Sequence, residues 1–140
     1  MKKLYLFLSV MLLTLVSVGF TSCGDDKDEP KGSDLIGTWQ LKAVDEDGAA
    51  YESLVQFTKN GVWNSVDIYT DEVGVQVDVE RGTYTVSGNR ITVSYTEDGQ
   101  TFSESFAFEV KGDKLMLTYD DFPVAVTLVR VKDSVIEQYL

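Results

Sequence analysis

The sequence predicts an all-β fold, most simply an eight-stranded antiparallel up-and-down barrel. Seven short segments rich in Gly, Asn and Asp divide residues 35–131 into eight runs, and such residues permit the positive φ angles of tight hairpins. Within the runs, Val, Ile, Thr, Tyr and Phe alternate with polar residues, as in half-buried strands. No part of this region has a clear helical repeat. The turn segments are 45–50, 59–61, 70–74, 87–89, 97–99, 111–113 and 120–123.

The alternation is clearest in the runs 73–80, 90–96 and 106–111. Short antiparallel strands of this kind bury one face each, and closing them into a barrel hides the sheet edges. Gly82 lies inside the long fourth run, 74–86, where a bend or bulge would let the strand curl. An open sandwich of two sheets is the alternative architecture.

The N-terminal segment has the pattern of a secretory signal. Lys2 and Lys3 precede an uncharged, mostly apolar run over residues 4–22, and Cys23 follows two small residues at its end. The alternative is a transmembrane helix, since 19 uncharged residues are just enough to span a bilayer. The small residues before the only cysteine favour a cleavable signal peptide over residues 1–22.

This boundary resembles the lipobox of bacterial lipoproteins, in which the cysteine becomes the first residue and carries acyl chains such as palmitate. The segment CGDDKDEP resembles the acidic export tag of Bacteroidetes surface lipoproteins. The resemblance implies that Cys23 is lipidated and that residues 23–34 form a flexible, acidic tether. It implies an outer-membrane protein, lipid-anchored and exposed at the cell surface, with the periplasmic face as the alternative.

Charge and composition exclude several functions. Cleavage after residue 22 removes two of the 12 basic residues and none of the 23 acidic ones, which leaves a formal charge of −13. Such a chain cannot neutralise phosphates, so nucleic-acid binding is excluded and cationic ligands are favoured. The sequence has no histidine, which removes Ser/His/Asp and Cys/His catalysis and imidazole metal ligands.

The ordered motifs of the domain resemble lipocalin-like domains. LIGTWQL (35–41) is similar to the Gly-x-Trp signature of a lipocalin first strand, and RGTYTVSGNRITV (81–93), GDKLMLTYDD (112–121) and VTLVRV (126–131) continue the likeness over residues 35–131. In lipocalins the signature tryptophan packs beneath an arginine near the end of the last strand. The resemblance implies that Gly37, Trp39 and Arg130 close the barrel floor. Residues 132–140 are expected to form one helical turn or a loose tail.

The interior of an eight-stranded barrel is filled by side chains or holds one small ligand. Glu104 shares the parity of inward aromatic residues, and a buried carboxylate must be paired, hydrogen-bonded or protonated. Arg81 or Arg90 could supply its partner, or Glu104 could hold a cationic or hydroxylated ligand. The alternative is a bulge after Gln100 that exposes Glu104. The candidate ligand-binding residues, which plain core packing would also explain, are Trp63, Tyr69, Tyr84, Tyr95, Glu104, Phe106 and Phe108, with Phe102 beside them.

The resemblance implies a membrane-anchored, monomeric protein that binds a small apolar or amphipathic ligand. The alternative is a filled barrel that serves as a surface interaction or structural module. The acidic segment 45–52 lacks the full spacing of a calcium loop and is interpreted as a hairpin turn, so neither a metal nor a cofactor is expected. No pair of acids has a spacing that indicates catalysis, so the chain is not expected to be an enzyme.

Overall fold

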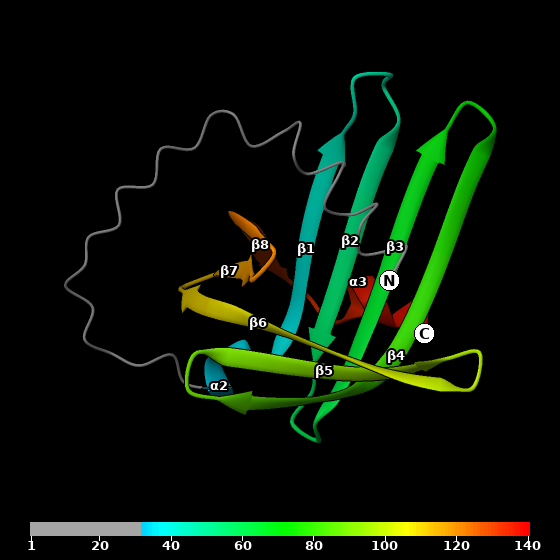
Figure 1. Cartoon of the computed structure of the whole chain (residues 1–140). Helices are drawn as coiled ribbons and strands as arrows, with labels where there is room; N and C mark the ends of the chain where they lie inside the picture. Colours follow the sequence, from blue (N-terminus) through cyan, green and yellow to red (C-terminus); the bar gives the residue numbers. More distant parts are fainter. Residues whose placement is uncertain (1–31) are drawn as a thin grey trace.

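Eight antiparallel strands follow one another around a closed barrel in the order of the sequence, as the computed structural model shows (Figure 1). The structure describes residues 32–140, so the predicted signal peptide, Cys23 and most of the tether lie outside the described residues. Each strand pairs with the next, and β1 closes the barrel by pairing with β8. The eight-stranded prediction is confirmed, and the open sandwich is wrong.

The strands and helices have these bounds: α2 Gly32–Leu35, β1 Gly37–Val44, β2 Ala50–Phe57, β3 Val62–Asp71, β4 Gly74–Ser87, β5 Arg90–Glu97, β6 Gln100–Lys111, β7 Lys114–Tyr119, β8 Phe122–Val131 and α3 Ser134–Glu137. The predicted tether therefore ends in a single helical turn, α2, immediately before β1.

Strand β4 changes partner at Gly82, where the barrel turns a corner. It pairs with β3 over residues 74–83 and with β5 over residues 82–87, without a register shift in either ladder. A Cβ atom on Gly82 would lie 2.0 Å from the carbonyl oxygen of Ser94, so only glycine allows this approach. The bend expected at Gly82 is present, and β5 and β6 cross the direction of β1 to β4 (Figure 1).

The barrel floor is closed by Arg130 and Trp39. The guanidinium carbon of Arg130 lies 4.2 Å from the Trp39 ring centroid, and its Nη1 donates to the Ile36 carbonyl oxygen at 2.9 Å. A Cβ atom on Gly37 would lie 2.5 Å from Arg130 Nη1, which explains why glycine precedes the tryptophan. Trp39 is fully buried and donates through Nε1 to the Leu35 carbonyl oxygen at 2.9 Å. The contact implied by the Gly-x-Trp resemblance is therefore present.

The C-terminal tail covers the outside of the barrel. Ile136, in α3, is fully buried and packs with Leu54, Val66 and Ile68 on the outer face of β2 and β3. The tail is therefore a packed helical turn and not a loose end. Within residues 32–140, no helix is both long enough and apolar enough to cross a membrane.

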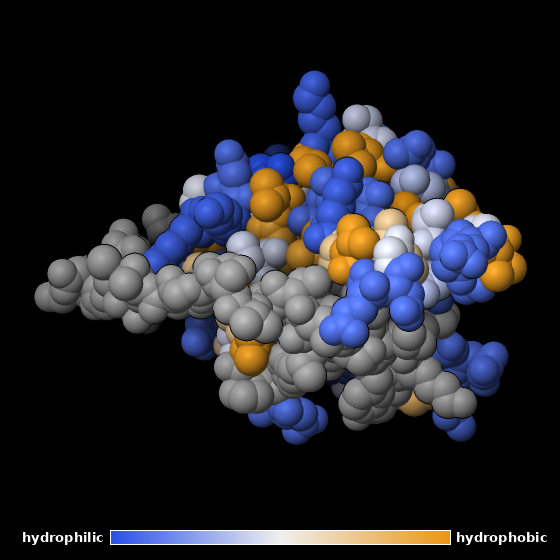
Figure 2. All heavy atoms as spheres, turned by 90° about the horizontal axis from the view of Figure 1, so that it is seen from above, coloured by the Kyte–Doolittle hydropathy of each residue, from blue (hydrophilic) through white to orange (hydrophobic). Residues whose placement is uncertain are grey.

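The valines of β4 face outward, although their alternation with polar residues correctly indicated a strand. Val75, Val77 and Val79 are 64%, 48% and 45% exposed, whereas Asp78 and Glu80 between them are half-buried on the inner side. Figure 2, which views the molecule from above, shows hydrophobic side chains at the surface among hydrophilic ones. The inner side of this part of β4 is therefore acidic.

Candidate functional site

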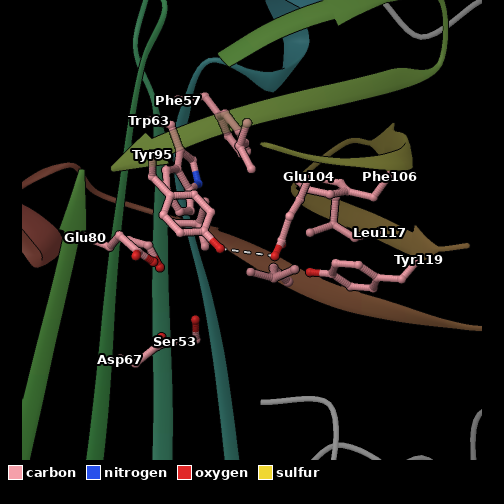
Figure 3. A pocket seen from close by; sticks show the side chains of 14 residues that line it. Ser53, Phe57, Trp63, Asp67, Glu80, Tyr95, Glu104, Phe106, Leu117 and Tyr119 are labelled. Carbon is pink, nitrogen blue, oxygen red and sulfur yellow. Dashed lines mark hydrogen bonds between the residues drawn. The ribbon is translucent and has the colours of Figure 1, made fainter. Parts of the chain in front are cut away.

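A cavity of about 70 Å³ lies inside the barrel, between the inward faces of β2 to β8 (Figure 3). Its walls come from alternate residues of these strands, because successive side chains of a strand point to opposite faces. The lining residues are Ser53, Val55, Phe57, Trp63, Ser65, Asp67, Glu80, Val93, Tyr95, Glu104, Phe106, Leu117, Tyr119 and Leu128.

Aromatic side chains form much of the cavity wall. The ring centroids of Trp63 and Tyr95 are 5.9 Å apart with a tilted arrangement, and those of Phe106 and Tyr119 are 5.3 Å apart. The Tyr95 ring also stacks on the Phe102 ring, with the two ring centroids 5.6 Å apart. Such pairs contribute about 0.5–1.5 kcal/mol beyond the burial of their area, so the aromatic wall is stabilised by its own packing.

Three carboxylates share the cavity with these rings. Glu104 accepts a hydrogen bond from the Tyr95 hydroxyl at 3.2 Å, and Asp67 accepts one from the Tyr51 hydroxyl at 2.7 Å. Glu80 enters from β4, on the other side of Tyr95 from Glu104 (Figure 3). Neither lysine nor arginine is among the lining residues. The cavity is therefore amphipathic, with an aromatic wall and an acidic side.

The position of Glu104 differs in part from expectation. It points inward, as its parity with Phe106 predicted, and the β5–β6 register runs without a bulge from Gln100 onward. The alternative of an exposed Glu104 is therefore wrong. Its hydrogen-bond partner is the Tyr95 hydroxyl and not an arginine.

Both proposed arginine partners lie on the outside of the barrel. Arg90 donates through Nη2 to Asp120 at 2.8 Å and through Nε to Ser105 at 3.2 Å. Arg81 is exposed on the outward face of β4, because it follows inward-facing Glu80. An inward carboxylate on β6 therefore cannot meet either side chain, since each lies on the opposite face of its strand.

Burial keeps the cavity tyrosines protonated. It raises the pKa of Tyr95, and the adjacent Glu104 carboxylate raises that pKa further. Burial likewise raises the pKa of Tyr51, with Asp67 adding to the effect, and the pKa of Tyr119, with Glu104 and Asp67 adding to it. A neutral phenol can donate a hydrogen bond to a carboxylate, as Tyr95 does to Glu104 and Tyr51 does to Asp67.

The structure brings together part of the predicted ligand-binding set. Trp63, Tyr95, Glu104 and Phe106 line the cavity, whereas Tyr69, Tyr84, Phe102 and Phe108 are not among its lining residues.

The other aromatic residues of that set have packing roles. The Tyr84 hydroxyl donates to the Thr58 carbonyl oxygen, and its ring meets Phe57 edge-on with centroids 5.0 Å apart. Phe108 is 4% exposed within the core cluster, and Tyr69 packs against the edge of that cluster. These side chains support the barrel without reaching the cavity, as the core interpretation of inward aromatics predicts.

Sequence reasoning missed the polar half of the cavity. Ser65 and Asp67 share the parity of Trp63 on β3, and Glu80 shares that of Tyr84 on β4, so alternation alone could have found them. They were missed because polar residues are normally assigned to the solvent face.

The acids do not form a metal site. Among the residues that the structure describes, no group of three His, Cys, Asp or Glu side chains converges as a metal ion would require. In the first hairpin, Asp45 instead accepts hydrogen bonds from the backbone N–H groups of Asp47 and Ala49, at 3.0 and 2.9 Å. This local cap is the hairpin turn that the acidic segment 45–52 predicted.

Comparison with known families supports the fold. A family model described as a lipocalin-like domain matches residues 35–117, more than half of the 140-residue chain. A search of curated proteins finds no match. The matched segment contains the Gly-x-Trp strand, the Gly82 corner and most of the cavity wall. The chain therefore belongs to the lipocalin-like domain family.

Proposed function

We propose that this chain is a lipid-anchored lipocalin-like protein that binds a small amphipathic ligand inside its barrel. The observation that supports the proposal is the cavity. Its wall combines aromatic side chains with polar groups at defined positions, which is typical of small-molecule sites. The pattern is one of binding rather than catalysis.

The size of the cavity limits the ligand. Its volume of about 70 Å³ is well below the range of roughly 300–1,000 Å³ that is common for drug-sized ligands. A long acyl chain or a large ring system would not be enclosed. The site suits a molecule of a few non-hydrogen atoms, or the head of a longer molecule whose remainder lies outside the cavity.

The anchor is proposed from the sequence before the barrel. Cys23 stands nine residues before Gly32, where α2 begins, so a lipidated cysteine would hold the barrel close to the membrane surface. Two or more acyl chains are needed for stable anchoring, because a single chain binds a bilayer only weakly. We place the protein on the outer membrane, at the cell surface, with the periplasmic face as the alternative.

Native mass spectrometry of the full chain, extracted gently from its own cell envelope, tests the binding function. We expect one small molecule per chain, and we expect substitution of Trp63→Ala to remove it. Glu109→Gln, on the outward side of β6, should retain it. If the wild-type protein carries no ligand and none of a panel of small amphipathic molecules binds it, the binding function is wrong.

A second candidate function is a surface interaction module, and the outward valines of β4 favour it. Val75, Val77 and Val79 form an exposed apolar row beside Val66 and Ile68 on β3. A photo-crosslinker at position 77 in intact cells tests this candidate. The interaction function would be supported if a defined protein were crosslinked and if this crosslink were lost when positions 75 and 79 are changed to serine. Crosslinks within the chain alone would contradict it.

A further inference from the structure

The chemistry of the cavity indicates more than a general amphipathic ligand. Asp67, Glu80 and Glu104 place three acids on its wall, and the other polar lining side-chain groups are hydroxyls and the indole N–H of Trp63. A site with this composition repels carboxylates and phosphates and attracts cations.

Glu104 is the best-placed of the acids. It reaches into the cavity from the middle of β6, where its side chain and the Tyr95 hydroxyl point toward each other (Figure 3). The single hydrogen bond from Tyr95 uses only one of the four or so acceptor sites of a carboxylate. Glu104 can therefore accept further hydrogen bonds from a ligand.

Ser65 is a second polar group on the cavity wall that a ligand could reach. It lines the cavity, is only 9% exposed, and makes no side-chain hydrogen bond within residues 32–140. It pairs in register with Glu80, so the hydroxyl and the carboxylate enter the cavity side by side. A serine hydroxyl can both donate and accept hydrogen bonds, so a ligand N–H group in the cavity can hydrogen-bond to Ser65.

The aromatic wall suits the same ligand. Trp63 and Phe106 line the cavity beside Tyr95 and supply the apolar surface that a short alkyl tail would contact. The Tyr119 hydroxyl also makes no hydrogen bond within the described part of the chain, and it points toward Glu104 (Figure 3). Polar and aromatic groups therefore surround one small region.

The arrangement distinguishes between kinds of cation. A bare metal ion needs several converging oxygen ligands, and the described acids do not converge in this way. A quaternary ammonium has no N–H group to satisfy Ser65 or Glu104. A primary ammonium has three donors on one nitrogen and can meet a carboxylate and a hydroxyl together.

We infer that the cavity binds a primary alkylammonium, with its charged head between Glu104 and Ser65 and its short apolar tail against the aromatic wall. This inference rests on the proposed binding function and specifies the class of ligand. Hydrogen bonds between charged groups are stronger than neutral ones, so the ammonium head contributes more to specificity than the tail.

The experiment compares three probes of equal chain length: hexylammonium, 1-hexanol and hexanoate. The full chain is reconstituted in nanodiscs of zwitterionic phosphatidylcholine and titrated with each probe by isothermal titration calorimetry. Empty nanodiscs are titrated as the blank. We expect hexylammonium to bind at least about tenfold more tightly than hexanol, since its hydrogen bonds are charge-assisted, and hexanoate not to bind.

Two variants assign the effect to the cavity. Glu104→Gln keeps the shape of the side chain and removes its charge, so hexylammonium should bind at least about tenfold more weakly while hexanol binding is unchanged. Glu109→Gln removes the same charge from the outer face of the same strand, where Glu109 contacts Lys111 at 3.3 Å. It should bind all three probes like the wild type.

The outcomes separate this inference from the proposed function. If hexanol binds as tightly as hexylammonium, the cavity binds ligands but the inference of a cationic ligand is overturned. The inference of a cationic ligand would also be overturned if hexanoate bound more tightly than hexylammonium. It would be overturned as well if Glu104→Gln weakened the binding of hexanol and the binding of hexylammonium equally. If no probe binds to the wild type above the blank, both the inference and binding of short amphipathic ligands fail.

Discussion

The guanidinium of Arg130 lies over the Trp39 ring, and two of its nitrogens donate hydrogen bonds to backbone carbonyl oxygens in the segment before β1. The guanidinium carbon lies 4.2 Å from the ring centroid, Nη1 bonds to the Ile36 carbonyl oxygen at 2.9 Å, and Nη2 bonds to the Asp34 carbonyl oxygen at 2.8 Å. One side chain on the last strand therefore joins the first strand and the segment that leads into it. This contact closes the floor of the barrel.

Replacing Arg130 with methionine should lower the free energy of unfolding by about 2–4 kcal/mol, because it removes a cation–π contact and two charged hydrogen bonds. Arg130→Lys should recover only part of this loss, since an ammonium cannot stack and bond to both carbonyls at once. Urea denaturation followed by tryptophan fluorescence measures both variants. A methionine variant as stable as the wild type would show that the contact is not a stabilising closure.

Gly82→Ala should destabilise the barrel, because its Cβ atom would lie 2.0 Å from the Ser94 carbonyl oxygen. Overpacking of this kind typically costs about 1–3 kcal/mol, and here the contact is with backbone that cannot rotate away. Thr83→Ala, at the next and outward-facing position, is the control and should change stability little. Equal thermal midpoints for Gly82→Ala and the wild type would contradict the close approach.

The buried tyrosines predict a loss of stability at high pH. The pKa values of Tyr51 and Tyr95 are raised in the folded protein, so folding favours their protonated forms. Their stabilising effect is complete below pH 10.0, the ordinary tyrosine pKa, and is lost as the pH rises above it. Each contributes up to about 1.4 kcal/mol per pH unit in that range.

Absorbance at 295 nm and circular dichroism during an alkaline titration measure this effect. We expect part of the tyrosine absorbance to appear only when the barrel unfolds, in one cooperative step. Full titration of every tyrosine near pH 10, with the circular dichroism of the barrel retained, would be inconsistent with buried phenols.

Ile136→Ala should cost about 2–4 kcal/mol, because truncating a fully buried isoleucine leaves a cavity against β2 and β3. Leu140→Ala, at a residue that is 56% exposed, is the matched control in the same tail. Chemical denaturation compares the two. If both variants match the wild type, the tail is not a stabilising part of the fold.

Cys23→Ser should prevent acylation and release the protein from the membrane fraction, since the serine hydroxyl cannot carry the thioether-linked lipid. Radiolabelled palmitate incorporation and membrane fractionation measure the two effects separately. A serine variant that remains in the membrane fraction after alkaline washing would instead indicate a membrane-spanning N-terminal segment.

The alternation of side chains along β4 shows how far the sequence can predict the site, because it identifies the strand but not which of its two faces points into the barrel. Val75, Val77 and Val79 alternate with polar residues, and a period-two pattern is normally assigned with its apolar side inward. The structure reverses this assignment, because β4 runs through Gly82 without a bulge and Tyr84 faces inward. A strand without a register shift keeps one parity throughout, so the inward side near Glu80 must be polar.

The strands, their turns and the Gly-x-Trp closure could all be predicted from the sequence. Those features depend on local alternation, on turn residues and on one recognisable motif, all of which are readable within a few residues. The three-dimensional fold was needed to show which aromatic residues line the cavity and that Glu104, Ser65 and Glu80 lie around it. These three polar side chains come from three strands, β3, β4 and β6, and their common position around the cavity depends on the corner at Gly82 and on the closure of β1 against β8.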